Sequence, residues 1–283
     1  MSDYEITFKV DGKIISQEQI REMELSRYHL VFKEMYEHEI VPLFHGIEVP
    51  KNAAKQMTLD ELKECLAETR ENLGRERIRE IYKKDLENGD KMWHEIAKNS
   101  VKGKNLQAGL VEVETKGISL EQFMVCNQSI AKNNNLTDAS KMHPEHYSFE
   151  AGTGGTQIII ETFGMYKYPT YLFLEPSKST DYPIPLDEDT LFPMFGKTSL
   201  MSDKTDTKII GMHQMKQRKG GMGVKLGVFL PEAAPKEIVE GHKWHLMVEF
   251  NNALHEAAKI KVNPVQKAAI GLALKKMGKE NHR

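Results

Sequence analysis

The segment GHKWHLMVEFNNALHEAAKI, residues 241–260, carries the clearest structural signal in this 283-residue chain. On a helix of 3.6 residues per turn, its polar residues fall at steps of three and four and form one stripe roughly 80° wide. The members of the stripe are His242, His245, Glu249, Asn252 and Glu256. An apolar sector lies beside them, made by Leu246, Met247, Phe250, Ala253, Leu254 and Ala257. The pattern predicts a long amphipathic helix near the C-terminus that packs on another layer.

The polar stripe has two interpretations. His245 and Glu249 are four residues apart, the spacing at which two side chains of one helix can reach the same metal ion. In that case His242 and Asn252, one turn away on either side, would orient the ligands or supply an alternate one. Alternatively, the stripe is a solvated helix face that happens to contain histidines. The rest of the sequence has to distinguish the two.

Composition and charge exclude several classes of protein. Charged residues make up 28% of the chain and hydrophobic residues 40%, as in ordinary globular domains, and the net charge of −2 offers no basic surface for a nucleic acid. The sequence contains no run of 18 apolar residues, the length that a membrane-spanning helix needs. The N-terminal residues MSDYEITFKVDG carry an acid early and lack the apolar core of a secretion signal. The two cysteines, Cys65 and Cys126, have no CxxC spacing, so we expect reduced thiols and a cytoplasmic protein.

A second informative segment is HPEHYSFEAGTGGTQIIIETFG, residues 143–164. Two β-like runs flank AGTGGT, whose glycines allow a tight hairpin connection. If Ala151 pairs with Thr156, the register places His146 opposite Glu161, with Cβ atoms about 4.5–5.5 Å apart. A histidine and a glutamate at that distance can share a metal ion or form a simple cross-strand hydrogen bond. A slip of one residue would separate the pair.

Residues 1–103 read as a helical region behind an N-terminal hairpin. The run 4–16 alternates around an Asp-Gly dipeptide, a hairpin turn signal. Three charged amphipathic helices follow within residues 17–99, and the pattern from Thr58 to Glu61 is that of a capping box. A helical region of this kind covers a sheet or builds a dimer interface, so we expect a homo-oligomer, with a homodimer as the simplest form.

Residues 104–283 read as a β-rich domain closed by the long helix. The polar run 127–138, with three consecutive asparagines, is expected to be a loop. The proline-rich segment 176–196 is expected to be a long ordered loop or lid, because its aromatic residues and prolines favour packing. The other expected elements are strands at 108–115 and 168–175, a hairpin across 208–230, and a small basic helix after Pro264.

Helices, an antiparallel meander and a final long helix match the α+β helix-grip (Bet v 1-like) arrangement. In that arrangement a curved antiparallel sheet wraps a long C-terminal helix and leaves a cavity between them. The helix stripe and the hairpin pair would then face the same cavity. Two histidines and two carboxylates suit a borderline divalent ion, with Zn²⁺ as first choice and Mn²⁺, Fe²⁺ or Co²⁺ as alternatives. The predicted ligands are His146, Glu161, His245 and Glu249.

These features resemble the phloretin hydrolase and diacetylphloroglucinol hydrolase family. The resemblance rests on the HPEHY segment at 143–147, a glutamate after its hairpin, a histidine in a later strand and the HxxxE helix. It implies a helical N-terminal portion and a helix-grip domain. It also implies zinc held by histidines and glutamates, and hydrolysis of a carbon–carbon bond beside a ketone on a phenolic ring, as in polyphenol degradation. Carried over by motif, Glu161, His245 and Glu249 would be metal ligands.

The resemblance also implies roles near the metal. His213, in a predicted strand, would be a catalytic group that donates a proton or a hydrogen bond to the phenol or its ring carbon; read from its strand alone, it is a hydrogen-bonded core residue. Glu161 or Glu249 would leave the metal to act as a base. The family's tryptophan-rich segment, with its histidine, is replaced here by FMVCNQSIAKNNN. His146 is therefore the candidate first ligand and His143 the alternate.

We expect a metal-dependent hydrolase that acts on an acyl-phloroglucinol or dihydrochalcone-like substrate, without a nucleic-acid or membrane partner. Two other classes remain open. Another metalloenzyme on the same scaffold, such as an isomerase, cyclase or ester hydrolase, would bind metal without cleaving such substrates. A non-catalytic binder of a hydrophobic small molecule would hold little metal and would lose only affinity when Glu249 is changed.

Overall fold

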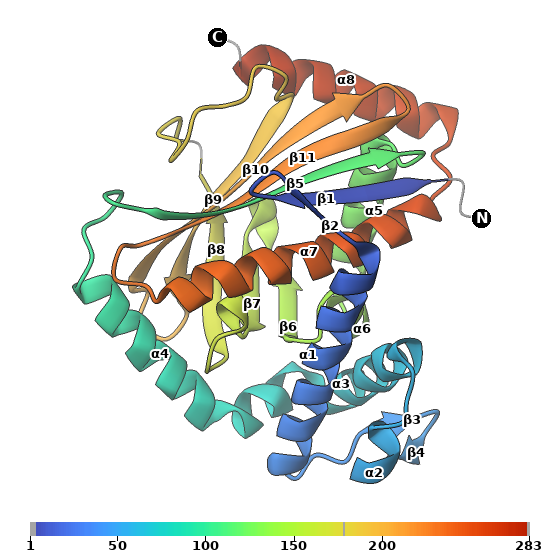
Figure 1. Cartoon of the computed structure of the whole chain (residues 1–283), viewed down its shortest axis with the longest axis vertical. Helices are drawn as coiled ribbons and strands as arrows, with labels where there is room; N and C mark the ends of the chain where they lie inside the picture. The colour runs from blue at the N-terminus through green and yellow to red at the C-terminus, as the bar shows by residue number, and fades with distance from the viewer. Residues whose placement is uncertain (1–3, 178, 282–283) are drawn as a thin grey trace.

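The computed structural model describes residues 4–177 and 179–281 and has an α+β architecture (Figure 1). Within these residues, nine strands form one antiparallel sheet. In chain order they are β1 (Glu5–Val10), β2 (Lys13–Ile15), β5 (Gln107–Lys116), β6 (His146–Ala151), β7 (Gln157–Glu161), β8 (Thr170–Pro176), β9 (Phe192–Leu200), β10 (Asp206–Arg218) and β11 (Gly221–Leu230). Across the sheet the order is β2-β1-β5-β11-β10-β9-β8-β7-β6. In Figure 1 the strands turn from nearly horizontal at β1 to nearly vertical at β6, so the sheet is strongly twisted.

The predicted α+β class and the long helix near the C-terminus are confirmed. This helix, α7 (Lys236–Ala258), packs on one face of the sheet, and in Figure 1 it lies between the sheet and the N-terminal helices. The N-terminal elements are α1 (Gln17–Glu37), a small sheet of β3 (Leu43–Phe44) and β4 (Ile47–Glu48), α2 (Lys51–Ala54), α3 (Leu59–Ile81) and α4 (Lys83–Lys98). The remaining helices are α5 (Leu120–Asn133), α6 (Leu136–Met142) and α8 (Pro264–Asn281). Across the described residues, none of the helices combines the length and the apolar character needed to cross a bilayer.

Local sequence signals place several elements where they were predicted. The N-terminal hairpin turns at Asp11 and Gly12, which both have positive φ. At the start of α3, the Thr58 hydroxyl accepts the backbone N–H of Glu61, and the Glu61 carboxylate accepts the N–H of Thr58. This capping box satisfies amide groups that the first helical turn cannot pair internally.

The N-terminal region is joined to both main layers. β1 pairs with β5, so the N-terminal hairpin extends the sheet formed by later residues. α1 packs against α7 on the side away from the sheet. The division at residue 103 and the homo-oligomer stay predictions.

The prediction of a loop over residues 127–138 is wrong, because α5 and α6 occupy this stretch with a short break between them. The apolar residues of α5 that pack into the core recur at steps of three and four: Phe123, Cys126 and Ile130. The asparagines mark the break instead. Asn134 has a left-handed backbone, with φ of 46°, and Asn135 caps α6 by accepting the N–H of Asp138.

The proline-rich segment contains more structure than predicted, because β9 begins within it. The described part of the loop before β9 packs on the sheet through Tyr182, Ile184 and Leu186. Met212 of β10 belongs to this cluster, whereas the next residue, His213, meets a ring of α7. Since successive residues of a strand point to opposite faces, the loop lies on the face away from α7. It therefore does not cover the side of the sheet where the histidines gather.

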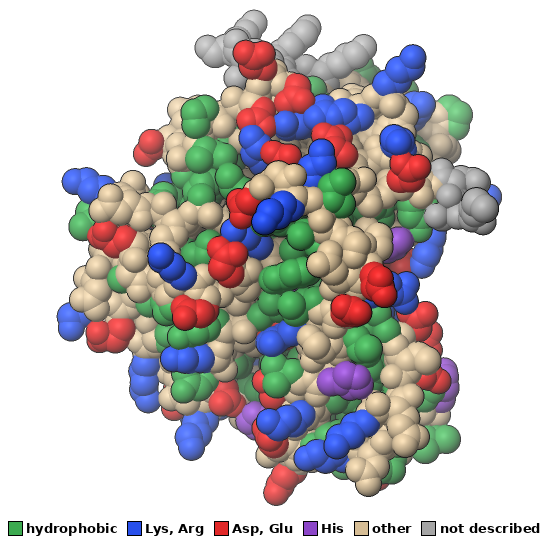
Figure 2. Space-filling view, in the orientation of Figure 1, with side chains coloured by type: hydrophobic (Ala, Val, Ile, Leu, Met, Phe, Trp, Pro, Cys, Tyr) green, Lys and Arg blue, Asp and Glu red, His purple; other side chains and the backbone are tan. Residues whose placement is uncertain are grey.

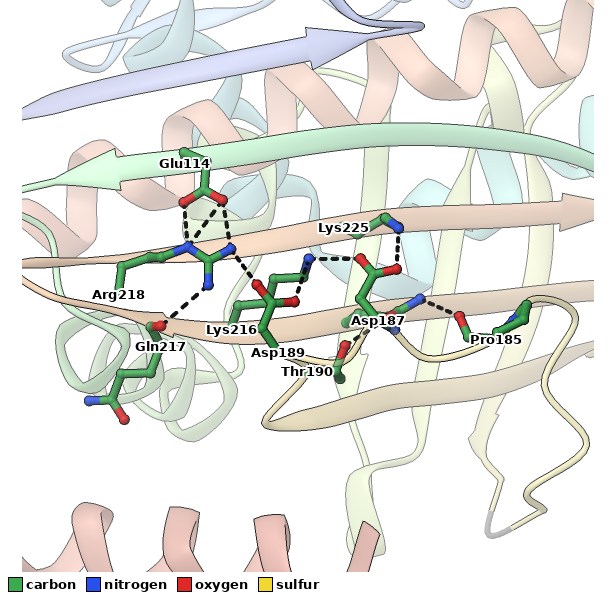
Figure 3. Close-up of polar contacts among 10 residues, drawn as sticks. Glu114, Pro185, Asp187, Asp189, Thr190, Lys216, Gln217, Arg218 and Lys225 are labelled. Carbon is green, nitrogen blue, oxygen red and sulfur yellow. Dashed lines mark hydrogen bonds and ion pairs between the residues drawn. The ribbon is translucent and has the colours of Figure 1, made fainter. Parts of the chain in front are cut away.

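An ionic cluster fastens this loop to β10 and β11 (Figure 3). Asp187 pairs with Lys216 at 2.7 Å and with Lys225, and Asp189 lies 2.9 Å from both Lys216 and Arg218. Burial raises the carboxyl pKa of Asp187, but hydrogen bonds from the two lysines outweigh it and lower the pKa. Charges of both signs are also interspersed over the face drawn in Figure 2.

Two glycines bring the end of β7 against α7. A Cβ atom on Gly241 would lie 1.9 Å from the carbonyl oxygen of Gly164, and Gly164 has a φ of 65°. The short helix η2 (Phe163–Met165), which follows β7, therefore touches the first turns of α7 backbone to backbone. This close approach sets the distance between Glu161 at the end of β7 and the histidines of α7.

We expect Gly241→Ala to destabilise the protein by about 1–3 kcal/mol, because the added methyl group forces η2 away from α7. Unfolding in urea measures the change. Gly271→Ala is the matched control, since a Cβ atom at Gly271 of α8 would meet nothing within 4 Å. That variant should keep or slightly raise the stability, because alanine favours a helix over glycine. Equal stability of Gly241→Ala and wild type would contradict the proposed contact.

Candidate metal centre

Three buried histidines meet between the edge of the sheet and α7. His143 ends α6, His146 begins β6, and His245 lies in the third turn of α7. Each is at most 4% exposed, and one ring nitrogen from each lies within 4.8 Å of the others. The ring of His245 stacks on that of His143, with centroids 3.8 Å apart. Such a cluster could hold a metal ion.

The predicted pairing of His146 with Glu161 is confirmed, but the hairpin reaches it by a different route. Nearer the turn, Ala151 pairs with Gln157, one residue away from the predicted register, because the connection contains a 3₁₀ turn and is longer than assumed. A β-bulge between His146 and Ser148 then adds one residue to β6. The predicted register is therefore wrong near the turn, where Ala151 pairs with Gln157, but the bulge brings His146 opposite Glu161 at the other end of the hairpin.

The closest ligand atoms form a triangle. Nε2 of His146 and Nε2 of His245 are 2.9 Å apart, and Oε2 of Glu161 lies 3.4 Å from the first and 3.8 Å from the second. The point equidistant from these three atoms is about 2.0 Å from each, which is the length of a zinc–nitrogen or zinc–carboxylate bond. Glu249 places a carboxylate oxygen 4.0 Å from Nε2 of His245. The four side chains expected to bind metal therefore lie together.

His143, the alternate ligand, belongs to the cluster but its ring is engaged differently. Its Nδ1 accepts the backbone N–H of Glu145 at 3.2 Å, so the proton of the neutral ring lies on Nε2. That Nε2 has no hydrogen-bond partner among the described residues. A metal bond at Nε2 would require the proton to move to Nδ1, which faces another N–H group. We therefore favour Glu161 over His143 as the third ligand beside His146 and His245.

Burial favours the neutral, metal-binding form of these imidazoles. Desolvation lowers the pKa of His143 and of His245 well below the ordinary value, and the charges of neighbouring histidines add to the effect. Burial also opposes protonation of His146, but the hydrogen bond with Glu161 and the charge of Glu249 outweigh it and raise the pKa. The pKa of Glu249 is raised by burial, against an opposing effect of His146.

Two other predicted histidines lie deep in the same part of the molecule. His242, one turn earlier on α7, stacks on Phe163 with ring centroids 4.2 Å apart. His213 projects from β10 toward α7, and its Nδ1 accepts the backbone N–H of Gly227 at 3.3 Å. Burial is the main cause that lowers the pKa of each ring to about 4, so both are neutral at pH 7.

Asn252, expected beside the metal, lies in a separate polar cluster. It donates to Glu24 and to the backbone oxygen of Met142, and it accepts from Lys63. Lys63 also pairs with Glu24 at 2.8 Å. Within the described residues, these are the hydrogen bonds of Asn252, which join α7 to α1 and α3.

Two arginines near the centre, the buried Arg70 and the half-buried Arg27, were missed in the sequence. Arg27 forms a bidentate pair with Glu145, the residue before His146. Arg70 donates to the backbone oxygen of His146 at 2.9 Å. Arg70 follows Leu66 by four residues on the apolar side of α3, and that spacing was the available signal. The charges of the N-terminal helices are therefore not all turned outward.

Comparisons of the chain with protein-family models, with curated proteins and with solved structures found no significant match. The residues of the centre themselves are therefore what indicates a metal ion. The relevant properties are the burial of the histidines, the spacing of the ligand atoms and the two nearby carboxylates.

We expect protein purified without an affinity tag or chelator to contain about one divalent ion per chain, by elemental analysis. His146→Ala and His245→Ala should each lose the ion, because each removes one nitrogen from the triangle. His94→Ala is the control, since His94 is 42% exposed in a surface pair with Asp203. Wild-type protein that stays free of metal after reconstitution, or full metal in both variants, would contradict the centre.

Proposed function

We propose that the protein is a metal-dependent hydrolase that cleaves a carbon–carbon bond next to a ketone on a phenolic substrate. The observation that carries the proposal is the convergence of His146, His245 and Glu161 at one buried point, with the carboxylate of Glu249 beside His245. Two histidines and two carboxylates suit zinc. The pattern also resembles the phloretin hydrolase and diacetylphloroglucinol hydrolase family, and this resemblance supports an acyl-phloroglucinol or dihydrochalcone-like substrate.

Charge balance supports a bound cation. Among the described residues, the ion pairs of Glu161 and Glu249 are with His146 and His245. Burial keeps His245 neutral, so two carboxylates face at most one protonated imidazole. Uncompensated negative charge in the interior is costly, and a divalent cation offsets both carboxylates. Zinc is the first choice, with Mn²⁺, Fe²⁺ or Co²⁺ as alternatives.

The residues of the centre suggest a division of roles. His146 and His245 would hold the ion through Nε2, with Glu161 and Glu249 as oxygen ligands. A divalent ion held there would lower the pKa of a water molecule and polarise a ketone oxygen. Either carboxylate can accept a proton from the attacking water. His213 presents its Nε2–H to the phenol or the ketone of the substrate, because its Nδ1 is occupied by a backbone N–H.

Partly accessible side chains support an internal binding recess. Burial raises the pKa of Glu249, yet 33% of its side-chain surface is accessible. His213 is also partly accessible, although burial lowers its pKa to about 4. Accessible surface on deeply placed groups is expected where they line a recess. A recess between a curved antiparallel sheet and a long helix characterises the helix-grip (Bet v 1-like) arrangement, which we propose for residues 104–283.

The metal-loaded protein should hydrolyse an acylated phloroglucinol or a dihydrochalcone, with the products followed by chromatography. His213→Gln should lower kcat about 10²–10³-fold while the metal content stays unchanged, because the amide does not place a hydrogen-bond donor where the neutral imidazole N–H lies and the substitution touches no ligand. His255→Gln is the matched control, since His255 pairs with Tyr4 at the far end of α7. Unchanged kcat in His213→Gln would remove His213 from the mechanism.

The same measurements separate the alternative functions. Bound metal without cleavage of these substrates would contradict the proposed reaction and favour another metalloenzyme, such as an isomerase, cyclase or ester hydrolase. Absence of metal with tight binding of a hydrophobic small molecule would favour a non-catalytic binder. Glu249→Gln distinguishes the two, because a ligand role predicts joint loss of metal and activity, whereas a binding role predicts loss of affinity alone.

A further inference from the structure

The outer edge of β6 is closed by side chains rather than by another strand. Within the described residues, β6 pairs with β7 only and is the last strand of the sheet. Arg70 donates to the backbone oxygen of His146 at 2.9 Å, and Arg75 donates to that of Phe149 at 3.0 Å. Both arginines belong to α3 and lie on either side of its kink at Gly74, where φ is 73°, so two consecutive helical segments hold the strand at two points.

Arg70 is a buried charged residue whose guanidinium is only partly hydrogen-bonded. It is 3% exposed, and the ion pairs of the described residues do not include it. Its guanidinium lies 4.8 Å from the ring centre of Tyr147, and its Nη2 is buried without a hydrogen-bond partner in the described chain. The charge of Glu34 acts on Arg70, but Glu34 accepts the Tyr147 hydroxyl and forms no ion pair with Arg70 among the described residues. Burying a cation without a carboxylate in direct contact usually lowers stability. Packing and stability alone therefore do not account for an arginine at this position.

The backbone group that Arg70 holds belongs to a proposed metal ligand. His146 is the first residue of β6, and the β-bulge follows it directly. A bulge bends its strand and leaves one residue unpaired in the ladder, so the direction of the His146 side chain is not fixed by strand pairing alone. The triangle of ligand atoms tolerates displacements of only about 0.5 Å before a metal bond is lost. A second support for this backbone is therefore needed.

We propose that Arg70 is a positioning residue of the metal centre: its hydrogen bond to the backbone oxygen of His146 holds Nε2 of that histidine at bonding distance from the ion. Arg27 supports the same turn from α1, because it pairs with Glu145 one residue earlier. The N-terminal helices thereby set the geometry of the centre without supplying a ligand. This inference rests on the metal centre of the proposed function.

The test compares arginines that cap the same strand. Arg70→Met keeps the packing on Tyr147 and removes the buried charge, and Arg70→Lys keeps the charge but not the planar donor group. Arg75→Met and Arg75→Lys are the matched controls at Phe149, away from the ligands. Each full-length protein is titrated with Co²⁺, followed by its visible absorption bands, and with Zn²⁺ against a chelator. Circular dichroism checks the fold of each variant.

Both Arg70 variants should bind Zn²⁺ about 10–100-fold more weakly than wild type, with shifted Co²⁺ bands at saturation. The Arg75 variants should bind with wild-type affinity and bands, even where they lower stability. A purely structural Arg70 would change the stability without moving the Co²⁺ bands. Arg70→Met keeps the test decisive if Arg70→Lys does not fold, because it leaves no buried charge without a partner.

The outcomes separate this inference from the proposed function. If wild-type protein binds neither Co²⁺ nor Zn²⁺, the metal centre and the role of Arg70 both fail. If wild type binds metal and the folded Arg70 variants match it in affinity and spectrum, the centre stands and the role of Arg70 fails. Equal weakening in the Arg75 variants would also overturn it, because the effect would then belong to β6 as a whole.

Discussion

A helix whose buried face carries polar side chains must find partners for them, and the rest of this structure depends on how far α7 meets that requirement. Near its start, His242 stacks on an aromatic ring. At its centre, His245 meets His146 and the carboxylate of Glu161. Toward its end, Asn252 joins a buried lysine–glutamate pair. The last arrangement is satisfied by hydrogen bonds and an ion pair, and the first leaves a neutral ring whose Nδ1 has no partner among the described residues, whereas the central one has an excess of carboxylates. A cation is therefore best accommodated at the centre of the helix.

The sequence predicts those parts of the centre that depend on short-range periodicity. The helical repeat places His245 and Glu249 on one face, and the alternation of a hairpin places His146 near Glu161. Their convergence depends instead on the contact of Gly164 with α7, where a side chain would prevent the approach. The helical repeat therefore predicted the pair in α7 and the hairpin alternation predicted the pair in β6 and β7. Neither pattern predicted how far apart the two pairs lie.

The errors of prediction have physical causes of the same kind. An alternation rule assumes one residue per step, so it cannot anticipate the bulge at which Tyr147 leaves the ladder and extends to Glu34 of α1. A rule that charged residues face water cannot anticipate Arg70, whose acceptor is a backbone group 76 residues away. Polar composition suggested a loop at 127–138, although the spacing of the apolar residues there already favoured a helix.

The enclosure of α7 also affects the order in which the protein can fold. The layers that cover it are α1, α5, α6 and the sheet, whereas α7 itself begins only at residue 236. Contacts between segments so far apart in sequence form slowly, and during synthesis α1 emerges long before the helix against which it packs. Until α7 arrives, the apolar side chains near the start of α1, Ile20 and Met23, lack their partners from α7 in the core. The ligand atoms of β6 and β7 also lack their partner until then, so a complete set of ligands is a property of the finished chain alone.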